Sequence, residues 1–294
     1  MIQPNTSNFP RITIIMPSFN QAKYIEESIQ SVLDQEYPNL EFMILDGGST
    51  DGSQDIIERY AHCLTYWHSQ PDKGQTDALI QGFDRSTGDL IGWVNSDDVL
   101  LPDCLQAIAT VFVARPECGL FGGNYVLIDS IGNIIRCKRH PANPVPFARY
   151  GLFVVNQPGS FFKRRDYEAV GGLNLYLHYV MDTDLYVRMM LNKTRFAHTN
   201  SYLAGFRKHP AAKTCAQIPQ AKREHIMAMR KYWPEYLGFV RTYNKGVMIY
   251  MAYQLLNGNY LLMTLESLFA RGHHWRTWFT AKFGTAINSL RLRK

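Results

Sequence analysis

Short apolar runs alternate with helically spaced apolar positions along the first 114 residues. Runs rich in β-branched and large apolar residues predict buried strands at residues 12–16, 42–45, 64–67 and 90–94. Apolar positions at helical spacing predict helices at residues 24–33, 53–60, 76–83 and 102–114. Strand–helix units repeated in this way form a mainly parallel sheet with helices on both faces, so we expect an α/β domain.

Polar side chains follow these strands at the points where the strands end. They are Ser18, Asp46, Asp72, Asp97 and Asp98. The carboxyl ends of parallel strands meet at one edge of a sheet, where α/β proteins bind ligands. Two adjacent carboxylates repel each other, and a divalent cation that also contacts substrate phosphates relieves the repulsion. We therefore expect a metal–diphosphate site at this edge, with a solvated turn that caps the helix near residue 102 as the alternative.

The pattern changes after residue 114. Two apolar segments, residues 120–128 and 133–137, predict a hairpin, and residues 160–162 predict a further strand. Short helices are expected at residues 166–170 and 184–191. From residue 221 onward the chain has a helical pattern rich in aromatic residues. We expect two parts, a ligand-binding domain of residues 1–220 and a helical tail of residues 221–294.

Charge is distributed unevenly between these parts. The 294 residues carry a net charge of +6, and residues 222–294 contribute +9, with 12 Lys and Arg against 3 Asp and Glu. The body is therefore mildly acidic, which argues against a nucleic-acid partner, while the basic tail suits an anionic one. The five cysteines include no CxxC pair and residues 1–10 lack a secretion signal, so we expect a cytoplasmic protein with free thiols.

Five short motifs occur in a specific order. They are IIMPSFN at residues 14–20, DGGSTDGS at 46–53, NSDD at 95–98, GGL at 171–173 and MDTDL at 181–185. Together they resemble glycosyltransferase family 2 over roughly residues 11–213, and PDKGQ at 71–75 with NQPGS at 156–160 resembles one of its subgroups. The resemblance implies a Rossmann-like GT-A fold, a nucleotide-sugar donor, and transfer to an acceptor hydroxyl with inversion.

The resemblance places the donor nucleotide at the ends of the first two strands. Pro17 and Ser18 would line the nucleotide pocket. The carboxylate of Asp46 would accept a hydrogen bond from the imide N–H of uracil, which favours UDP. Stabilising the turn at Gly47 is the alternative role of Asp46. Some family members carry a second acidic residue at the position of Gly47.

The NSDD motif corresponds to the DxD-type metal element of the family. The resemblance implies that Asp98 binds Mn²⁺ or Mg²⁺ and that Asp97 contacts the ribose or the sugar. The metal would neutralise charge that develops on the departing diphosphate. His209 is a candidate further metal ligand, because imidazole is a common one.

Asp182 stands at the position of the catalytic base of the family. A carboxylate within hydrogen-bond reach can take the proton of the acceptor hydroxyl as the new bond forms. Family members often carry Glu before this Asp, where this chain has Met181. An apolar neighbour of this kind would raise the pKa of Asp182 by desolvation. Capping the following helix is a compatible role, and Asp184 is expected to be a first-turn residue of that helix.

The remaining candidates follow from the same resemblance. Three basic residues would contact the donor: Lys73, Arg207 and Lys213. Gln157 and Ser160 are expected to contact the transferred sugar or the acceptor.

The tail contains two apolar segments, residues 247–256 and 260–269, which residues 257–259 divide. Neither reaches the ~20 apolar residues that a membrane-spanning helix needs. Residues 271–294 combine aromatic residues with six basic and no acidic ones, which suits an interfacial helix on an anionic membrane leaflet. We expect peripheral contact with the inner face of the membrane and a glycan or lipid-linked acceptor. Packing of these helices on the catalytic domain is the alternative.

Two other functions are consistent with an α/β fold. A nucleotidyltransferase would carry a glycine-rich, basic loop directly after the first strand, and residues 16–20 contain neither feature. A catalytically degenerate sugar-binding or scaffold protein would have no reason to keep four carboxylates at the strand and helix ends. These observations favour a metal-dependent glycosyltransferase.

Overall fold

A nine-stranded mixed sheet forms the centre of the protein. The computed structural model describes residues 9–148, 150, 152, 155, 157–213, 218–236, 242 and 244–278. The strand order is β3-β2-β1-β4-β8-β6-β9-β5, and β7 pairs with β6. The strands are β1 Ile12–Ser18, β2 Leu40–Asp46, β3 Tyr66–Ser69, β4 Leu90–Trp93, β5 Val99–Leu100, β6 Leu120–Ile128, β7 Ile134–Lys138, β8 Ser160–Lys163 and β9 Phe196–Arg207.

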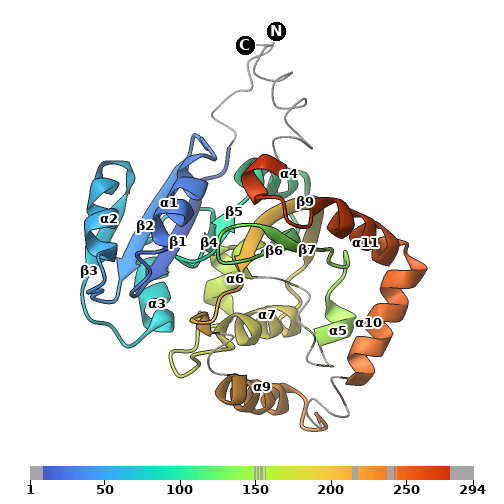
Figure 1. The fold of residues 1–294 in the computed structure, drawn as a ribbon. Coiled ribbons are helices and arrows are strands. Elements are labelled where there is room, and N and C mark those ends of the chain that lie inside the picture. Colours follow the sequence, from blue (N-terminus) through green and yellow to red (C-terminus); the bar gives the residue numbers. More distant parts are fainter. Residues whose placement is uncertain are drawn as a thin grey trace.

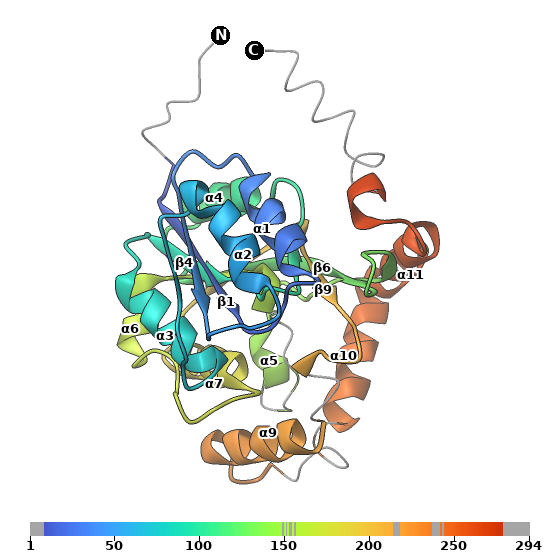
Figure 2. The same cartoon turned by 60° about the vertical axis from the view of Figure 1, so that its left-hand side comes forward.

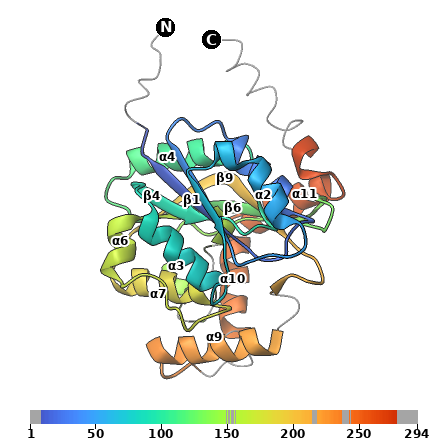
Figure 3. The same ribbon diagram turned by 90° about the vertical axis from the view of Figure 1, so that its left-hand side faces the viewer.

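Helices cover both faces of this sheet (Figure 3). On one face lie α1 Ile25–Leu33, α2 Ser53–Arg59 and α4 Cys104–Ala114, and on the other α3 Gln75–Arg85, α6 Arg164–Ala169 and α7 Met181–Leu191. Strand β1 shows why both faces are covered, because its side chains alternate. Ile14 packs with α1 and α4, whereas Ile15 packs with α3 and α7. The α/β domain predicted from the sequence is confirmed.

Strands β1 to β4 pair in parallel, and the later strands reverse direction. Strand β1 pairs in parallel with β2 and β4, and β2 with β3. Strand β8 is antiparallel to both β4 and β6, while β9 runs parallel to β6. The carboxyl ends of β1, β2 and β4 consequently meet at one edge, as the sequence pattern predicts.

Strand β9 was not predicted from the sequence. It is 12 residues long, and its middle is polar and partly exposed, so no alternating pattern is visible there. Pairing with β6 and with the two-residue strand β5 holds it in the sheet. The strand delivers its last residue, Arg207, to the turn that follows β4.

Three further helices follow the sheet (Figures 1 and 2). They are α9 Ile218–Tyr232, α10 Asn244–Leu256 and α11 Asn259–Ala270. Three short helical elements lie earlier in the chain: η2 Ala61–Cys63, α5 Val145–Ala148 and η3 Gln157–Gly159. Gly246, which the sequence pattern suggests as an interruption, lies inside α10, where its missing side chain permits close packing on Tyr150 and Leu152. Within the described part of the chain, no helix has the length and hydrophobicity to cross a membrane.

The segment after α11 joins the sheet at the β6–β7 turn. The amide of Ile134 donates to the carbonyl of His273 (2.8 Å), and the amide of Trp275 donates to the carbonyl of Gly132 (3.0 Å). The indole rings of Trp275 and Trp278 are buried in a cluster with side chains of β6 and β7. These two aromatic residues, which the sequence places at a membrane interface, therefore belong to the protein core.

Candidate active site

A cavity of about 660 Å³ opens at the carboxyl edge of the parallel strands. It is lined by residues from the ends of β1 and β4, the segments after β2 and β3, the start of α7, and the segment after β9. Lining residues expected from the sequence are Pro17, Ser18, Asp97, Gln157, Asp182, Arg207 and Lys213. The topology thus brings together residues that are up to 196 positions apart in the chain.

Asp97 and Asp98 point to different surroundings. Asp97 lines the cavity, and its Oδ2 lies 3.0 Å from Nε2 of His209. Asp98 is fully buried and accepts hydrogen bonds from the amide of Arg207 (2.8 Å) and the side chain of Asn95 (3.0 Å). Burial and the charge of Asp97 raise the pKa of Asp98. Of the two carboxylates, Asp97 is the one that a ligand in the cavity can reach.

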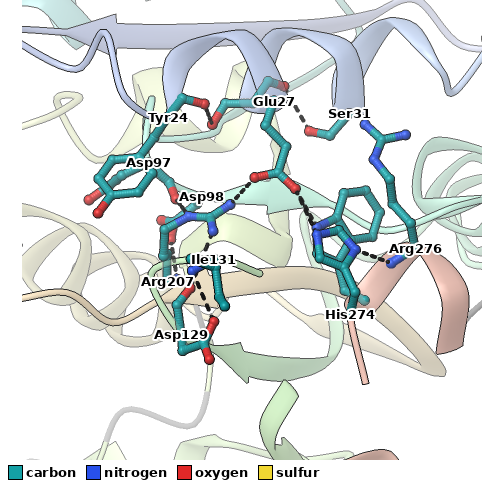
Figure 4. Close-up of polar contacts among 12 residues, drawn as sticks. Tyr24, Glu27, Ser31, Asp97, Asp98, Asp129, Ile131, Arg207, His274 and Arg276 are labelled. Carbon is teal, nitrogen blue, oxygen red and sulfur yellow. Dashed lines mark hydrogen bonds and ion pairs between the residues drawn. The ribbon is translucent and has the colours of Figure 1, made fainter. Parts of the chain in front are cut away.

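Arg207 is a buried structural cation (Figure 4). Its guanidinium donates to the carbonyl of Asp97 (2.7 Å), the carbonyl of Asp129 (3.2 Å) and the carboxylate of Glu27 (2.6 Å). The side chain therefore fixes the turn that carries Asp97. Its donors are directed at protein acceptors, whereas the sequence assigned them to a diphosphate.

Glu27, on α1, connects Arg207 to the C-terminal segment. Its second carboxylate oxygen accepts from the indole N–H of Trp275 (2.8 Å) and lies 3.7 Å from Nε2 of His274. Figure 4 shows Glu27 between His274 and Arg207. A continuous chain of polar contacts thus runs from the segment after α11 to the backbone of Asp97.

Asp46 faces the interior of its own turn. Its carboxylate accepts from the amides of Gly48 (3.1 Å) and Ser49 (2.8 Å) and from the hydroxyls of Ser49 (2.5 Å) and Ser69 (2.6 Å). It is completely buried. This geometry favours the alternative role given above, stabilisation of the turn.

Asp72 occupies the space that Gly47 leaves open. It lines the cavity, and a Cβ atom at Gly47 would lie 3.0 Å from its Oδ2. A side chain at position 47 would press against the carboxylate of Asp72, which would have to shift to make room for it. The strand pattern predicts that Asp72 lies at this edge, but it indicates no role for the residue. Gly47, at a position where some family members carry an acidic residue, is the feature of the sequence that indicates a different carboxylate there.

A chain of side-chain hydrogen bonds forms one wall of the cavity. Nζ of Lys213 donates to Gln75 (3.1 Å), and Nε2 of Gln75 donates to Asn95 (2.7 Å). Nδ2 of Asn95 donates to Gln157 (2.9 Å), whose own amide nitrogen donates to the carbonyl of Trp93 (2.7 Å). Because lysine can only donate, the orientation of every amide in the chain is determined. Sequence reasoning gave Asn95 no role.

Five predicted site residues lie outside the cavity lining: Asp46, Asp98 and His209, which are buried, and Lys73 and Ser160. Lys73 is exposed to solvent beyond it. Ser160 is buried, and its hydroxyl donates to the carbonyl of Gln157 (3.1 Å) and contacts the hydroxyl of Tyr186. Ser160 therefore helps to position Gln157 through this hydrogen bond and does not itself face the cavity.

Asp182 is the half-buried carboxylate at the first turn of α7. It lines the cavity beside Met181. Burial raises the pKa of Asp182, and a hydrogen bond from Thr183 (2.6 Å) and the charge of Lys213 oppose part of this rise. A carboxylate with a raised pKa is a better proton acceptor. Asp184 is buried and ion-paired with Arg188 (2.6 Å), as expected of a residue within the helix.

Residues 13–171 match the family model described as Glycosyl transferase family 2. The chain belongs to this family. It is 31% identical over 254 residues to an uncharacterized glycosyltransferase of Rickettsia typhi, over 82% of this chain and 74% of the relative. It is 29% identical over 192 residues to an uncharacterized glycosyltransferase of Mycobacterium tuberculosis, over 62% and 70%. The putative teichuronic acid biosynthesis glycosyltransferase TuaG of Bacillus subtilis is 34% identical over 126 residues, 42% of this chain and half of TuaG.

Solved structures show the same fold. The mannosyltransferase PcManGT from Pyrobaculum calidifontis, in complex with GDP-Man and Mn²⁺, superposes with a TM-score of 0.60 at 19% identity, covering 95% of this chain and 86% of the other. Residues 1–349 of Staphylococcus aureus TarS, in complex with UDP-GlcNAc, give 0.55 at 16% identity, covering 75% and 66%. The chain is thus a GT-A-like glycosyltransferase that uses a nucleotide-sugar donor.

Proposed function

We propose that this glycosyltransferase moves a sugar, with inversion, from a nucleoside diphosphate to a hydroxyl of a glycan or lipid-linked acceptor. The observation that carries the proposal is the placement of Asp97, Asp182 and Lys213 around one cavity. An acidic metal-binding group, a carboxylate base and a cation are the groups that such a displacement needs.

The nucleotide would bind against the end of β1. Pro17 and Ser18 line the cavity there, next to Asp72. We assign the base contact to Asp72, because the carboxylate of Asp46 already accepts four hydrogen bonds inside its turn. A carboxylate at this place accepts N–H groups of uracil or guanine. UDP remains our first candidate, and the titration below distinguishes it from GDP.

Asp97 and His209 would hold a Mn²⁺ or Mg²⁺ ion. The carboxylate oxygen of Asp97 and the imidazole nitrogen of His209 face each other at 3.0 Å and would supply two protein ligands, while among the described residues no group of three or more His, Cys, Asp or Glu could hold a metal. Mg²⁺ is commonly bound through one or two carboxylates plus substrate phosphates and water, and Asp97 would supply such a carboxylate. The metal, when bound, would stabilise negative charge on the leaving diphosphate. We assign Asp98, which the sequence named as the ligand, to supporting the turn.

Asp182 would act as the base of a single displacement. The acceptor oxygen bonds to C1 of the sugar from the face opposite the nucleotide, and the bond from C1 to the diphosphate breaks. The hydroxyl proton passes to the carboxylate of Asp182. The positive charge of Lys213 interacts with the carboxylate of Asp182. The same charge would stabilise the negative charge of the departing diphosphate. Attack from the opposite face inverts the configuration at C1.

Calorimetric titration of the purified protein with UDP, GDP and dTDP, with and without Mn²⁺, tests this assignment. We expect one nucleotide to bind only when Mn²⁺ is present. The variant Asp97→Asn should lose this metal-dependent binding. Asp72→Asn should weaken that nucleotide about tenfold or more, since hydrogen bonds to charged groups contribute roughly 1.5–3 kcal/mol. Leu191→Gln, on the exposed end of α7, is the matched control. Absence of binding by all three nucleotides would contradict the proposed donor site.

A further inference from the structure

The outer surface of α10 and α11 is apolar. Of the 19 large hydrophobic side chains exposed among the described residues, 11 lie between residues 248 and 269. They are Met248, Ile249, Met251, Leu255, Leu256, Tyr260, Leu261, Leu262, Leu265, Leu268 and Phe269. Leu256 and Phe269 are 87% and 76% exposed. A concentration of exposed apolar side chains of this kind marks an interaction site. We name these 11 residues the α10–α11 apolar face.

The opposite, inward side of the two helices carries polar groups beside apolar ones, because Val247, Tyr250 and Tyr253 pack against the buried Phe147 and Leu152. Gln254 donates to the carbonyl of Arg139 (2.9 Å), and Glu266 forms a two-pronged ion pair with the same arginine (2.9 Å for each contact). The hydroxyl of Ser267 accepts from the amide of Cys137 (3.1 Å). A helix on a water-exposed surface normally presents polar side chains outward, whereas the outer sides of these two helices are apolar. The two helices are therefore built for an apolar environment on their outer side.

We propose that the α10–α11 apolar face docks on an anionic lipid bilayer. Charge supports this choice, because residues 244–294 contain seven Lys and Arg and a single acidic residue. That acidic residue, Glu266, is turned inward and paired. Exposed basic residues, Lys245 and Arg271, stand near the far ends of the two helices. Anionic headgroups attract such charges when the apolar side chains between them enter the acyl region.

The chemistry of the face also suits lipid better than a protein. Protein interfaces are enriched in aromatic, methionine and arginine side chains and combine them with directional hydrogen bonds. Here six of the 11 exposed side chains are leucines, and Tyr260 and Thr264 supply the polar atoms of α11 on this side. The helices have 13 and 12 residues, too short to span a bilayer. They would lie in its surface, a role the sequence assigned to residues 271–294.

Vesicle flotation measures this docking without any substrate. We expect the full-length protein to float with vesicles of phosphatidylcholine and 30% phosphatidylglycerol, and less with phosphatidylcholine alone or in 0.5 M salt. The variant Leu261→Gln/Leu265→Gln/Leu268→Gln should lower the partition coefficient more than about tenfold, because burial of one leucine contributes about that factor. The control Val113→Gln, at an exposed apolar position on α4, should bind as the wild type does.

Two results would overturn the proposal. One is equal flotation of the triple variant and the wild type. The other is a wild type that does not float but forms a dimer, seen in sedimentation velocity, that the triple variant loses, since the occupant would then be a second copy. Far-ultraviolet circular dichroism of the same preparations shows that the variant is folded and keeps this test independent of the proposed donor chemistry.

Discussion

At the scale of single residues, Asp182 is the group on which the proposed chemistry depends most. Asp182→Asn keeps the size and the hydrogen bond to Thr183 but cannot take a proton. We expect kcat to fall about 10²–10⁴-fold, the usual contribution of a general base. Nucleotide affinity should stay within about twofold. Donor turnover and calorimetry measure the two quantities, and a variant that retains full kcat would remove Asp182 from the mechanism.

The pH profile of kcat gives a second readout of Asp182. Burial raises its pKa above the ordinary value, and the charge of Lys213 pulls it down. The base works when deprotonated, so activity should rise with pH through this raised pKa. In Lys213→Gln the stabilising cation is lost, the pKa rises further, and the acidic limb should move to higher pH. Lys213→Arg keeps the charge and should leave the limb in place; an equal shift in both variants would contradict the coupling.

Which side chains gather at the cavity was predictable, but the direction of each was not. The ends of parallel strands share an edge, so Asp72 and Asp97 could be placed there from the strand pattern alone. Successive residues at a strand end point to opposite sides, and the sequence does not say which one faces the ligand. The geometry turns Asp46 and Asp98 inward and Asp97 outward. Only the fold decides between chemically identical neighbours.

At the scale of elements, the segment after α11 braces the turn that carries Asp97. Trp275 donates to Glu27, which holds Arg207 against the carbonyl of Asp97. Trp275→Phe keeps the buried ring and removes this donor. We expect the free energy of unfolding to fall by about 1–2 kcal/mol, and the affinity for nucleotide with Mn²⁺ to fall severalfold. Denaturant titration and calorimetry measure these changes.

A second tryptophan variant distinguishes the loss of the hydrogen bond to Glu27 from a general loss of packing. Trp67→Phe alters a tryptophan packed in the core at β3, on the other edge of the sheet. Its loss of stability should leave nucleotide affinity unchanged. If both tryptophan variants lost affinity equally, the contact to Glu27 would have no special role in holding the turn.

Periodicity found the elements that are amphipathic and missed those defined by long-range pairing. Helix α1 and strand β1 follow from apolar spacing because one side of each faces the core. Strand β9 is held by β6 and β5, which are distant in the sequence, and its polar middle hides it. Helices α10 and α11 could be recognised as helices but not oriented. Gln254 and Glu266 face Arg139, a partner that periodicity does not reveal.

At the scale of the whole molecule, the C-terminal helices share cores with the sheet domain. Helix α9 contributes Met229 to a cluster with Val187 of α7, and Trp275 packs with Val126 of β6. The division at residue 220 therefore remains a prediction about function, with the donor site on one side and membrane contact on the other. Mutual burial of this kind favours joint unfolding of the two parts.

Two buried histidines and one half-buried histidine make the stability of this joint fold depend on pH. Burial lowers the pKa of His140 to about 3, and those of His198 and His225 to about 4. An unfolded histidine has a pKa near 6.5, so between these values the unfolded chain binds more protons and stability falls as the pH falls. Each histidine should cost about 2 kcal/mol at pH 5 relative to pH 7, and the three together about 6 kcal/mol, which is comparable with the ~5–15 kcal/mol of a typical domain.

Urea titrations at pH 7 and pH 5 test this dependence. His140→Phe should remove about one third of the difference in unfolding free energy, because both ring nitrogens of His140 lack a hydrogen-bond partner in the described structure and its ring stacks on Tyr125. His62→Gln, at an exposed position, should leave the difference unchanged. A His140→Phe protein with the full pH dependence would show that this histidine takes up its proton without unfolding, and that its burial is not what opposes the charge.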